Sequence, residues 1–307
     1  MCINVVQHSK KTNNMSNSHD LSSLFFLRSS CTYSSSSSSY PLHPFLIPLP
    51  SSSYRTRVFV YASSSSDVRK RFLRVHYKTT TSDAPVIFFI HGGFWKNKYH
   101  IDNNCHDTLK RFYVDRGFVF VDVEYRARDD VGGGYPGTCD DVYDAYRYFI
   151  SSCFFSLSCS IDLDRIVIMG HSAGGQLALR SSTLVKCSLV VCIAPCCNLV
   201  EGVKCELGDD GTAVLRFMGC HYSDCIEAYE DAGSGLYSSL SPQFIVSGGL
   251  DVDIPSDYVY DHYVSKRKKE FGITEYLHVS NADHYDLTNA SHESTSMILR
   301  VILKYIK

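Results

Sequence analysis

The sequence of 307 residues lacks several features that would assign it early to a class of protein. Its longest apolar runs, such as APVIFFI, fall far short of the roughly 18 to 20 residues that span a bilayer and have the length of buried strands. The formal net charge is only −2, so neither nucleic acid nor an acidic membrane surface is an expected partner. We therefore expect a soluble protein without a membrane span.

The sequence also lacks any CxxC pair, although it contains 13 cysteines. Apolar or helical patterns, typical of reduced core residues, surround Cys139, Cys153, Cys187 and Cys192. A looser group consists of Cys196, Cys197, Cys205, Cys220, His221 and Cys225. A metal site in this group is an open alternative, but its spacing repeats no ligand pattern. Free thiols in a reducing compartment, and no metal, are the expectation.

Acidic residues are almost absent from residues 1–66, which contain 20 serines, five Lys or Arg and a single acid, Asp20. This composition is compatible with an organellar transit peptide, and equally with a disordered extension that buries too little surface to fold. We take residues 67–307 as the folded domain. The expected compartment is the cytoplasm, or an organelle if residues 1–66 act as a transit peptide.

Short apolar runs and helical patterns alternate along the rest of the chain. Strands are expected at 74–78, 86–90, 118–125, 165–170, 188–194, 243–248 and 274–279. Helices are expected at 104–116, 138–153, 174–185, 256–271 and 292–306. This alternation indicates one α/β domain with a mostly parallel sheet covered on both faces. Residues 197–240 interrupt the pattern, and we expect them to form a small cap above the sheet.

The segment VIMGHSAGGQLAL contains Gly-x-Ser-x-Gly between a predicted strand and a predicted helix. Ser172 is its serine, and Gly170 and Gly174 flank it. A serine on such a sharp turn needs small neighbours and exposes its hydroxyl. The amide of Ala173 and the helix N-terminus are then directed at negative charge that develops nearby. This pattern predicts Ser172 as a nucleophile.

A base and an acid follow Ser172 along the chain. In SNADHYDL, His284 lies between the final strand and the final helix, which is the place of the base when the order is Ser, acid, His. In FIVSGGLDVDIP, Asp251 comes just after a strand and is predicted to orient His284. Asp253 is the alternative acid, but a capping or solvent-exposed position suits it better. The histidines that fit less well, on a helix, in a strand and at a helix start, are His262, His278 and His292.

The segment FFIHGGFW follows the second predicted strand and can supply an oxyanion hole. Gly92 makes the bend, and the amides of Gly93 and Phe94 are predicted to point inward together with the first amide of the helix. His91 is predicted to orient this loop rather than to transfer protons. Phe94 and Trp95 either wall an aromatic substrate or simply pack against the protein.

These segments resemble the α/β-hydrolase superfamily over about residues 70–307. HGGFW departs from the HGGG of hormone-sensitive-lipase-like esterases and is similar to the HGGxW of kynurenine formamidases (arylformamidases). GHSAGG and ADHYDL are similar to the nucleophile and histidine segments of that family. The resemblance implies an α/β-hydrolase fold, a triad of Ser172, Asp251 and His284, and hydrolysis of N-formyl-L-kynurenine to kynurenine and formate. This chemistry requires no cofactor.

Two other functions stay open. Isoprenylcysteine methylesterases and broad carboxylesterases carry close variants of the same motif, so a carboxylesterase that acts on small esters is the alternative. A catalytically silent binding protein with the hydrolase fold is a remote third possibility. It is disfavoured because the chain keeps all three predicted triad residues and the oxyanion loop.

Overall fold

The computed structural model describes residues 53–61, 69–103, 106–236, 238–270 and 275–307. The chain divides into two compact units, residues 1–41 and 42–307, and the first lies outside the described residues. The predicted transit peptide or disordered extension therefore lies outside them too, except for 53–61. Within the described part of the chain, no helix has the length and apolarity needed to cross a membrane.

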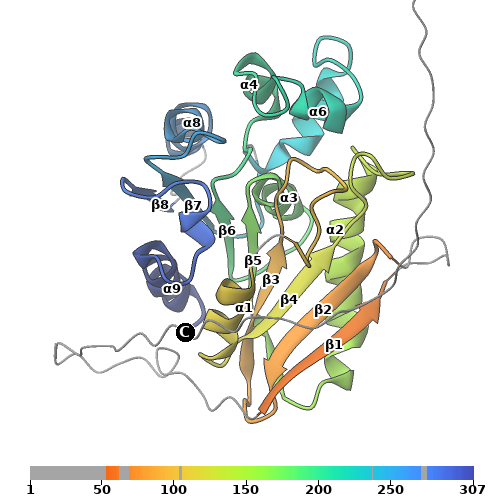
Figure 1. Cartoon of the computed structure of the whole chain (residues 1–307), viewed down its shortest axis with the longest axis vertical. Helices are drawn as coiled ribbons and strands as arrows, with labels where there is room; N and C mark the ends of the chain where they lie inside the picture. Colours follow the sequence, from red (N-terminus) through yellow and green to blue (C-terminus); the bar gives the residue numbers. More distant parts are fainter. Residues whose placement is uncertain (1–52, 62–68, 104–105, 237, 271–274) are drawn as a thin grey trace, which may run out of the picture. The chain divides into compact units, whose positions relative to one another are not determined.

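An eight-stranded sheet forms the centre of the second unit, in the order β1-β2-β4-β3-β5-β6-β7-β8 (Figure 1). The strands are β1 (Tyr54–Val60), β2 (Phe72–Lys78), β3 (Ala84–Ile90), β4 (Val119–Glu124), β5 (Ile161–His171), β6 (Leu189–Ile193), β7 (Gln243–Gly248) and β8 (Glu275–Val279). β2 pairs antiparallel with β1 and with β4, and the other pairs are parallel. The seven predicted strands are all present, and the sheet is mostly parallel as expected.

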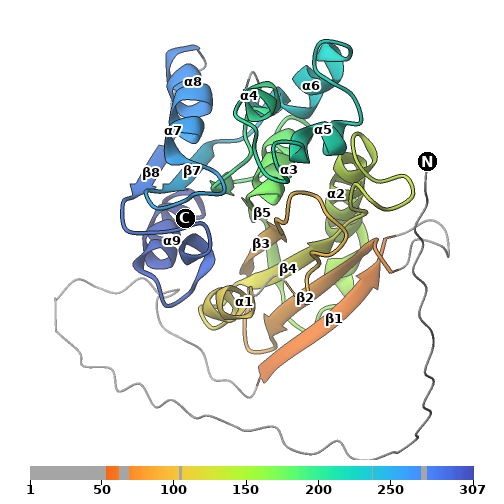
Figure 2. The same cartoon turned by 45° about the horizontal axis from the view of Figure 1, so that its top comes forward.

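Helices cover the sheet on both faces, as the alternating pattern predicts. The helices that follow strands are α1 (Asp107–Val114), α2 (Gly137–Tyr148), α3 (Ala173–Ser181), α7 (Ser256–Val259), α8 (Ser265–Glu270) and α9 (Glu293–Tyr305). α1 and α9 lie on one side of the sheet, and α2 and α3 on the other (Figures 1 and 2). Ile298, Leu299, Ile302 and Leu303 of α9 are buried, which is the single apolar stripe expected of a helix that packs on a core.

The stretch between β6 and β7 contains three short helices, α4 (Leu199–Lys204), α5 (Ala213–Met218) and α6 (Ile226–Ala232). They lie at the end of the sheet where β5 and β6 finish (Figure 1). This is the predicted excursion above the sheet, which we call the insert (residues 197–240). In parallel sheets that edge is where the catalytic groups gather, so the insert is placed to contact them.

Strand β1 is a feature that the sequence analysis missed. Its seven residues pair with β2 over their whole length, from Tyr54 opposite Lys78 to Val60 opposite Phe72. Most of its side chains are exposed, because it is an edge strand held mainly by backbone hydrogen bonds. An edge strand of this kind carries no strong apolar pattern. The domain boundary expected at residue 67 is therefore too late.

The cysteines follow the expectation only in part. Cys139, Cys153 and Cys192 are free and buried, and Cys187 is free and half-buried. Cys220 and Cys225, expected as free thiols, instead form a disulfide. The turn between them brings their Cα atoms within 6.5 Å, which lies inside the range that a disulfide spans. These two thiols are thus committed to each other rather than shared with a metal.

Candidate active site

Ser172 lies between the end of β5 and the first residue of α3, with backbone angles of φ 56° and ψ −119°. A side chain at Gly170 would place its Cβ 2.0 Å from the carbonyl oxygen of Gly174. A side chain at Gly174 would place its Cβ 2.1 Å from the carbonyl oxygen of Ile90. Both predicted glycines are thus required by close backbone approach, and the strained turn has the geometry of a nucleophile elbow.

A cavity of about 250 Å³ lies over this turn. Four of the predicted site residues line it, namely Ser172, His284, Gly93 and Phe94. They come from three segments that are widely separated in the sequence and meet at one edge of the sheet. The structure therefore brings the predicted nucleophile, base and oxyanion loop to a common space.

Asp251 and His284 form a buried pair beside this cavity. His284 Nδ1 lies 2.8 Å from Asp251 Oδ2, and the two residues are 5% and 6% exposed. The other carboxylate oxygen, Asp251 Oδ1, accepts the amides of Asp253 at 3.0 Å and Ile254 at 2.8 Å. One oxygen of Asp251 is thus fixed by the backbone, while the other faces the imidazole.

The sequence analysis also considered Asp253 as the acid and three other histidines as the base. These residues either lie elsewhere or have another role. Asp253 lines the cavity, and its amide supports Asp251. It does not cap α7, whose N-cap position is Pro255. Of the histidines that fitted less well, His262 lies in a helical turn at 260–264, His278 lies in β8, and His292 is the N-cap of α9.

The predicted oxyanion loop follows β3 and has an unusual backbone. Gly93, Phe94 and Trp95 have consecutive positive φ angles of 110°, 50° and 57°. Gly92 has no room for a side chain, because a Cβ there would lie 2.8 Å from the carbonyl oxygen of His171. Within the described residues, none of the hydrogen bonds found uses the amides of Gly93, Phe94 or the first helical residue, Ala173. These amides are therefore available to a ligand.

Trp95 does not wall the cavity. It is 1% exposed, its ring stacks on Phe217 of α5 at a centroid distance of 4.2 Å, and its Nε1 donates to Gln176 Oε1 at 3.2 Å. Phe94 lines the cavity instead. Of the two roles left open for these aromatic residues, packing applies to Trp95 and contact with the cavity applies to Phe94.

The cavity is also lined by two histidines that the sequence analysis did not select, His106 and His171. His171 Nε2 donates to the carbonyl oxygen of His284 at 3.0 Å, which ties the turn around Ser172 to the loop of the predicted base. Burial lowers the pKa of His171 well below its ordinary value and that of His106 to about 4, so both are neutral at pH 7. Only the position of His171 next to Ser172 could have signalled this role.

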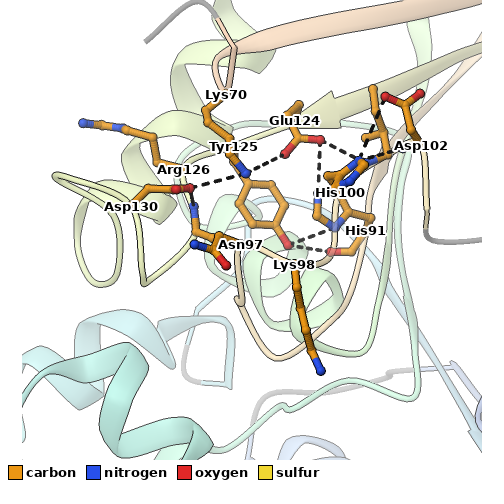
Figure 3. Close-up of polar contacts among 12 residues, drawn as sticks. Lys70, His91, Asn97, Lys98, His100, Asp102, Glu124, Tyr125, Arg126 and Asp130 are labelled. Carbon is orange, nitrogen blue, oxygen red and sulfur yellow. Dashed lines mark hydrogen bonds and ion pairs between the residues drawn. The ribbon is translucent and has the colours of Figure 1, made fainter. Parts of the chain in front are cut away.

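His91 and Glu124 form a buried polar group behind the oxyanion loop (Figure 3). His91 stacks on Tyr125 at a centroid distance of 4.4 Å, and the Tyr125 hydroxyl donates to the His91 carbonyl oxygen at 2.8 Å. Glu124 Oε2 accepts the amide of Ile101 at 2.9 Å and lies 3.9 Å from His91 Nε2. Burial lowers the pKa of His91 to about 4 and raises that of Glu124 to about 7. A neutral His91 held in this way fits the predicted orienting role.

Replacement of Glu124 by Gln is expected to make the protein more stable at high pH. The pKa of Glu124 is about 7 in the folded protein, against an ordinary value of 4.5, so the folded state binds the proton more tightly. The contribution of Glu124 to the unfolding free energy therefore falls as pH rises from about 4.5 to 7. Glu124→Gln removes this loss, on the order of 3 kcal/mol of unfolding free energy above pH 7. Urea unfolding at several pH values measures it.

The matched control for this prediction is Glu227→Gln, because Glu227 is exposed on α6. Its unfolding free energy should follow that of the wild type at every pH. A Glu124→Gln variant whose difference from the wild type stayed constant between pH 4.5 and 8 would contradict titration of Glu124 in this window.

Comparison with known proteins identifies the fold. Residues 74–190, less than half of the chain, match the BD-FAE protein family. A search of curated proteins gives no match. Esterase B from Lactobacillus rhamnosis superposes with a TM-score of 0.64 at 17% identity, covering 85% of this chain and 88% of that one.

Two further solved structures have a similar fold. A hyperthermophilic esterase from the archaeon Pyrobaculum calidifontis has a TM-score of 0.61 at 17% identity, covering 82% of this chain and 85% of that one. A thermostable carboxylesterase from a metagenomic library has a TM-score of 0.63 at 22% identity, covering 84% and 90%. The predicted α/β-hydrolase fold is confirmed. None of these matches is described as a kynurenine formamidase, so the predicted subgroup receives no support.

Proposed function

We propose that the protein is a serine carboxylesterase that cleaves small esters through an acyl-enzyme intermediate. The observation that carries this proposal is the hydrogen bond between Asp251 and His284, together with the cavity that His284 and Ser172 both line. The descriptions of the structural neighbours as esterases support the same class of reaction.

In the proposed mechanism, Ser172 Oγ attacks the ester carbonyl while His284 Nε2 accepts the hydroxyl proton. Asp251 accepts a hydrogen bond from His284 Nδ1, which keeps the imidazole in the required tautomer. His284 then donates the proton to the departing alcohol. In the second half of the reaction, His284 takes a proton from water, the resulting hydroxide attacks the acyl-enzyme, and Ser172 recovers its proton as the carboxylic acid leaves.

The oxyanion of each tetrahedral intermediate is stabilised by the amides of Gly93, Phe94 and Ala173. Each such donor is worth roughly 3 kcal/mol of transition-state stabilisation in a site of this kind. Ala173 is also the first residue of α3, so the partial positive charge of the helix N-terminus adds to its effect.

The size of the cavity favours small substrates. At about 250 Å³ it lies below the roughly 300 to 1,000 Å³ of pockets for drug-sized ligands. N-Formyl-L-kynurenine was expected from the HGGxW motif, but the tryptophan of that motif, Trp95, is packed against Phe217 and Gln176. Trp95 therefore offers no surface to an aromatic substrate, although Phe94 does line the cavity. The preference for a short-chain ester over the formamide rests on the small cavity and on the esterases among the structural neighbours.

The test is turnover by the purified full chain of p-nitrophenyl acetate, butyrate and octanoate and of N-formyl-L-kynurenine. We expect the acetate and butyrate esters to have by far the largest kcat/KM, with a decline for octanoate because its chain exceeds the cavity. An alkyl phosphonate should modify Ser172, as identified by peptide mass. If the formamide were turned over much faster than the esters, the proposed substrate would be wrong. If the phosphonate modified a different serine, the proposed site would be wrong.

A further inference from the structure

The oxyanion loop does not hold its own conformation. Phe94 and Trp95 are consecutive non-glycine residues with φ angles of 50° and 57°, a region that is unfavourable for such side chains. Residues in this region keep their conformation only where the surrounding structure imposes it. Contacts from outside the loop must therefore fix the direction of its amides.

The insert contacts three consecutive residues of this loop. The ring of Phe94 lies so close to Gly208 that a Cβ at position 208 would be 2.6 Å from its Cζ. Trp95 stacks on Phe217 of α5. Lys96 Nζ forms an ion pair with Asp209, whose side chain is 13% exposed. The insert thus packs against the loop at each position that follows Gly93.

Asp209 joins this contact to a third segment. Its second carboxylate oxygen pairs with Arg128, whose side chain is 2% exposed. The backbone amide of Arg128 donates to the carbonyl oxygen of Trp95 at 2.7 Å, and its Nη1 donates to that of Ala213 at 2.9 Å. A single carboxylate therefore links the oxyanion loop, the segment after β4 and the insert.

The carboxylate of Asp209 lies among several positive charges, and its own charge helps to hold them together. Burial, and after it the nearby cations Lys98, Arg128 and Arg216, lower the pKa of Lys96, while Asp129 acts in the opposite direction. Without the negative charge of Asp209, Lys96 and Arg128 would repel each other. Among the described residues, only Asp129, whose carboxylate lies 3.7 Å from Arg128 Nε, would offset that repulsion. That repulsion would act directly on the residue next to Trp95.

We propose that Asp209 is a positioning residue that, through Lys96 and Arg128, holds the oxyanion loop with the amides of Gly93 and Phe94 directed into the cavity. In this view the insert is a fixed part of the oxyanion hole and not a separate lid. The proposal rests on the proposed esterase function for its kinetic consequence. Its structural consequence, the rigidity of the loop, can be measured without any activity.

The test compares Asp209→Asn with Asp210→Asn in the full chain. Asp210 is a close match, because it is the next residue, has a similar φ of 53° and is exposed. Asparagine tolerates positive φ as well as aspartate does, so neither variant disturbs the backbone and each removes one charge. Circular dichroism verifies that both variants are folded.

The expected kinetic result for Asp209→Asn is a loss of about 10- to 100-fold in kcat for p-nitrophenyl acetate, with KM changed far less. The reason is that a displaced oxyanion amide stabilises the transition state less well, whereas the free energy of binding the ester is almost unchanged. The rate of phosphonate reaction with Ser172 should fall in parallel, because this adduct also needs the oxyanion hole. Asp210→Asn should match the wild type in all three measurements.

Amide hydrogen–deuterium exchange at Lys96 and Arg128 is the independent readout, because these amides donate to the carbonyl oxygens of Gly93 and Trp95 at 3.0 and 2.7 Å. It should become faster in Asp209→Asn and stay unchanged in Asp210→Asn. Wild-type exchange and wild-type kcat in Asp209→Asn would overturn the proposal. Faster exchange in Asp209→Asn, in a protein whose wild type hydrolyses no ester, would instead refute the proposed function and support the role of Asp209 in holding the loop.

Discussion

Ser172→Ala is expected to lower kcat for p-nitrophenyl acetate by at least about 10⁴-fold, with little change in KM. The hydroxyl of Ser172 is the atom that forms the acyl-enzyme, whereas the cavity that binds the ester keeps its shape when one oxygen is removed. Steady-state kinetics with the full chain, combined with the loss of phosphonate labelling, measures this effect. Because alanine is smaller than serine and fits the same space, the variant is expected to fold.

A control for this variant lies on the helix that follows. Ser181 is buried near the end of α3, and its hydroxyl donates to the carbonyl oxygen of Leu177 at 2.8 Å. Ser181→Ala should therefore retain wild-type kinetics. Ester hydrolysis that survived in Ser172→Ala would place the chemistry elsewhere. A wild-type protein that bound esters without turnover would revive the alternative of a silent binding protein with this fold.

The predicted triad could be located from the sequence because each member follows its own strand. Ser172, Asp251 and His284 come after β5, β7 and β8, and the carboxyl ends of parallel strands meet at one edge of a sheet. The buried strands themselves were predictable from their apolar runs. Local signals of this kind, joined by a simple rule of topology, were sufficient to bring three distant residues together.

Contacts that depend on irregular segments could not be predicted in this way. Asp209 lies in an insert without helical or strand periodicity, and nothing in its surroundings indicates that it pairs with Lys96, which is 113 residues earlier. The hydrogen bond from His171 to the carbonyl of His284 spans a similar separation. Strand β1 was missed for another reason, since its stability comes from backbone pairing that leaves no apolar pattern.

Trp95 illustrates why a motif predicts a fold better than a substrate. HGGxW predicts a loop after β3, where its glycines allow a close backbone approach, and none of the hydrogen bonds found among the described residues uses the amides of Gly93 and Phe94. Its tryptophan contributes by packing against Phe217 and by its hydrogen bond to Gln176. A residue with that role is compatible with many substrates, so the motif alone does not separate a formamidase from an esterase.

Asp251→Asn is expected to lower kcat for p-nitrophenyl acetate by about 10⁴-fold. An asparagine oxygen can still accept the amides of Asp253 and Ile254 that Asp251 Oδ1 accepts now, so the loop is expected to keep its shape. The side-chain NH₂ then faces His284 Nδ1 as a donor and stabilises the tautomer that carries its proton on Nε2. In that tautomer Nε2 of His284 carries the proton and has no lone pair with which to accept the proton of Ser172, while the lone pair on Nδ1 accepts from the asparagine.

Asp253→Asn is the matched variant, because Asp253 was the alternative acid in the sequence. Its carboxylate lies within 4.8 Å of the Asp251 and His284 ligand atoms, but the carboxylate at hydrogen-bonding distance from His284 is that of Asp251. Removal of its charge should therefore change kcat by less than about 10-fold, as expected for a charge that makes no direct hydrogen bond in a polar cavity. If the large loss appeared in Asp253→Asn and not in Asp251→Asn, the orienting role would pass to Asp253. Equal large losses in both would mean that His284 depends on the two carboxylates together.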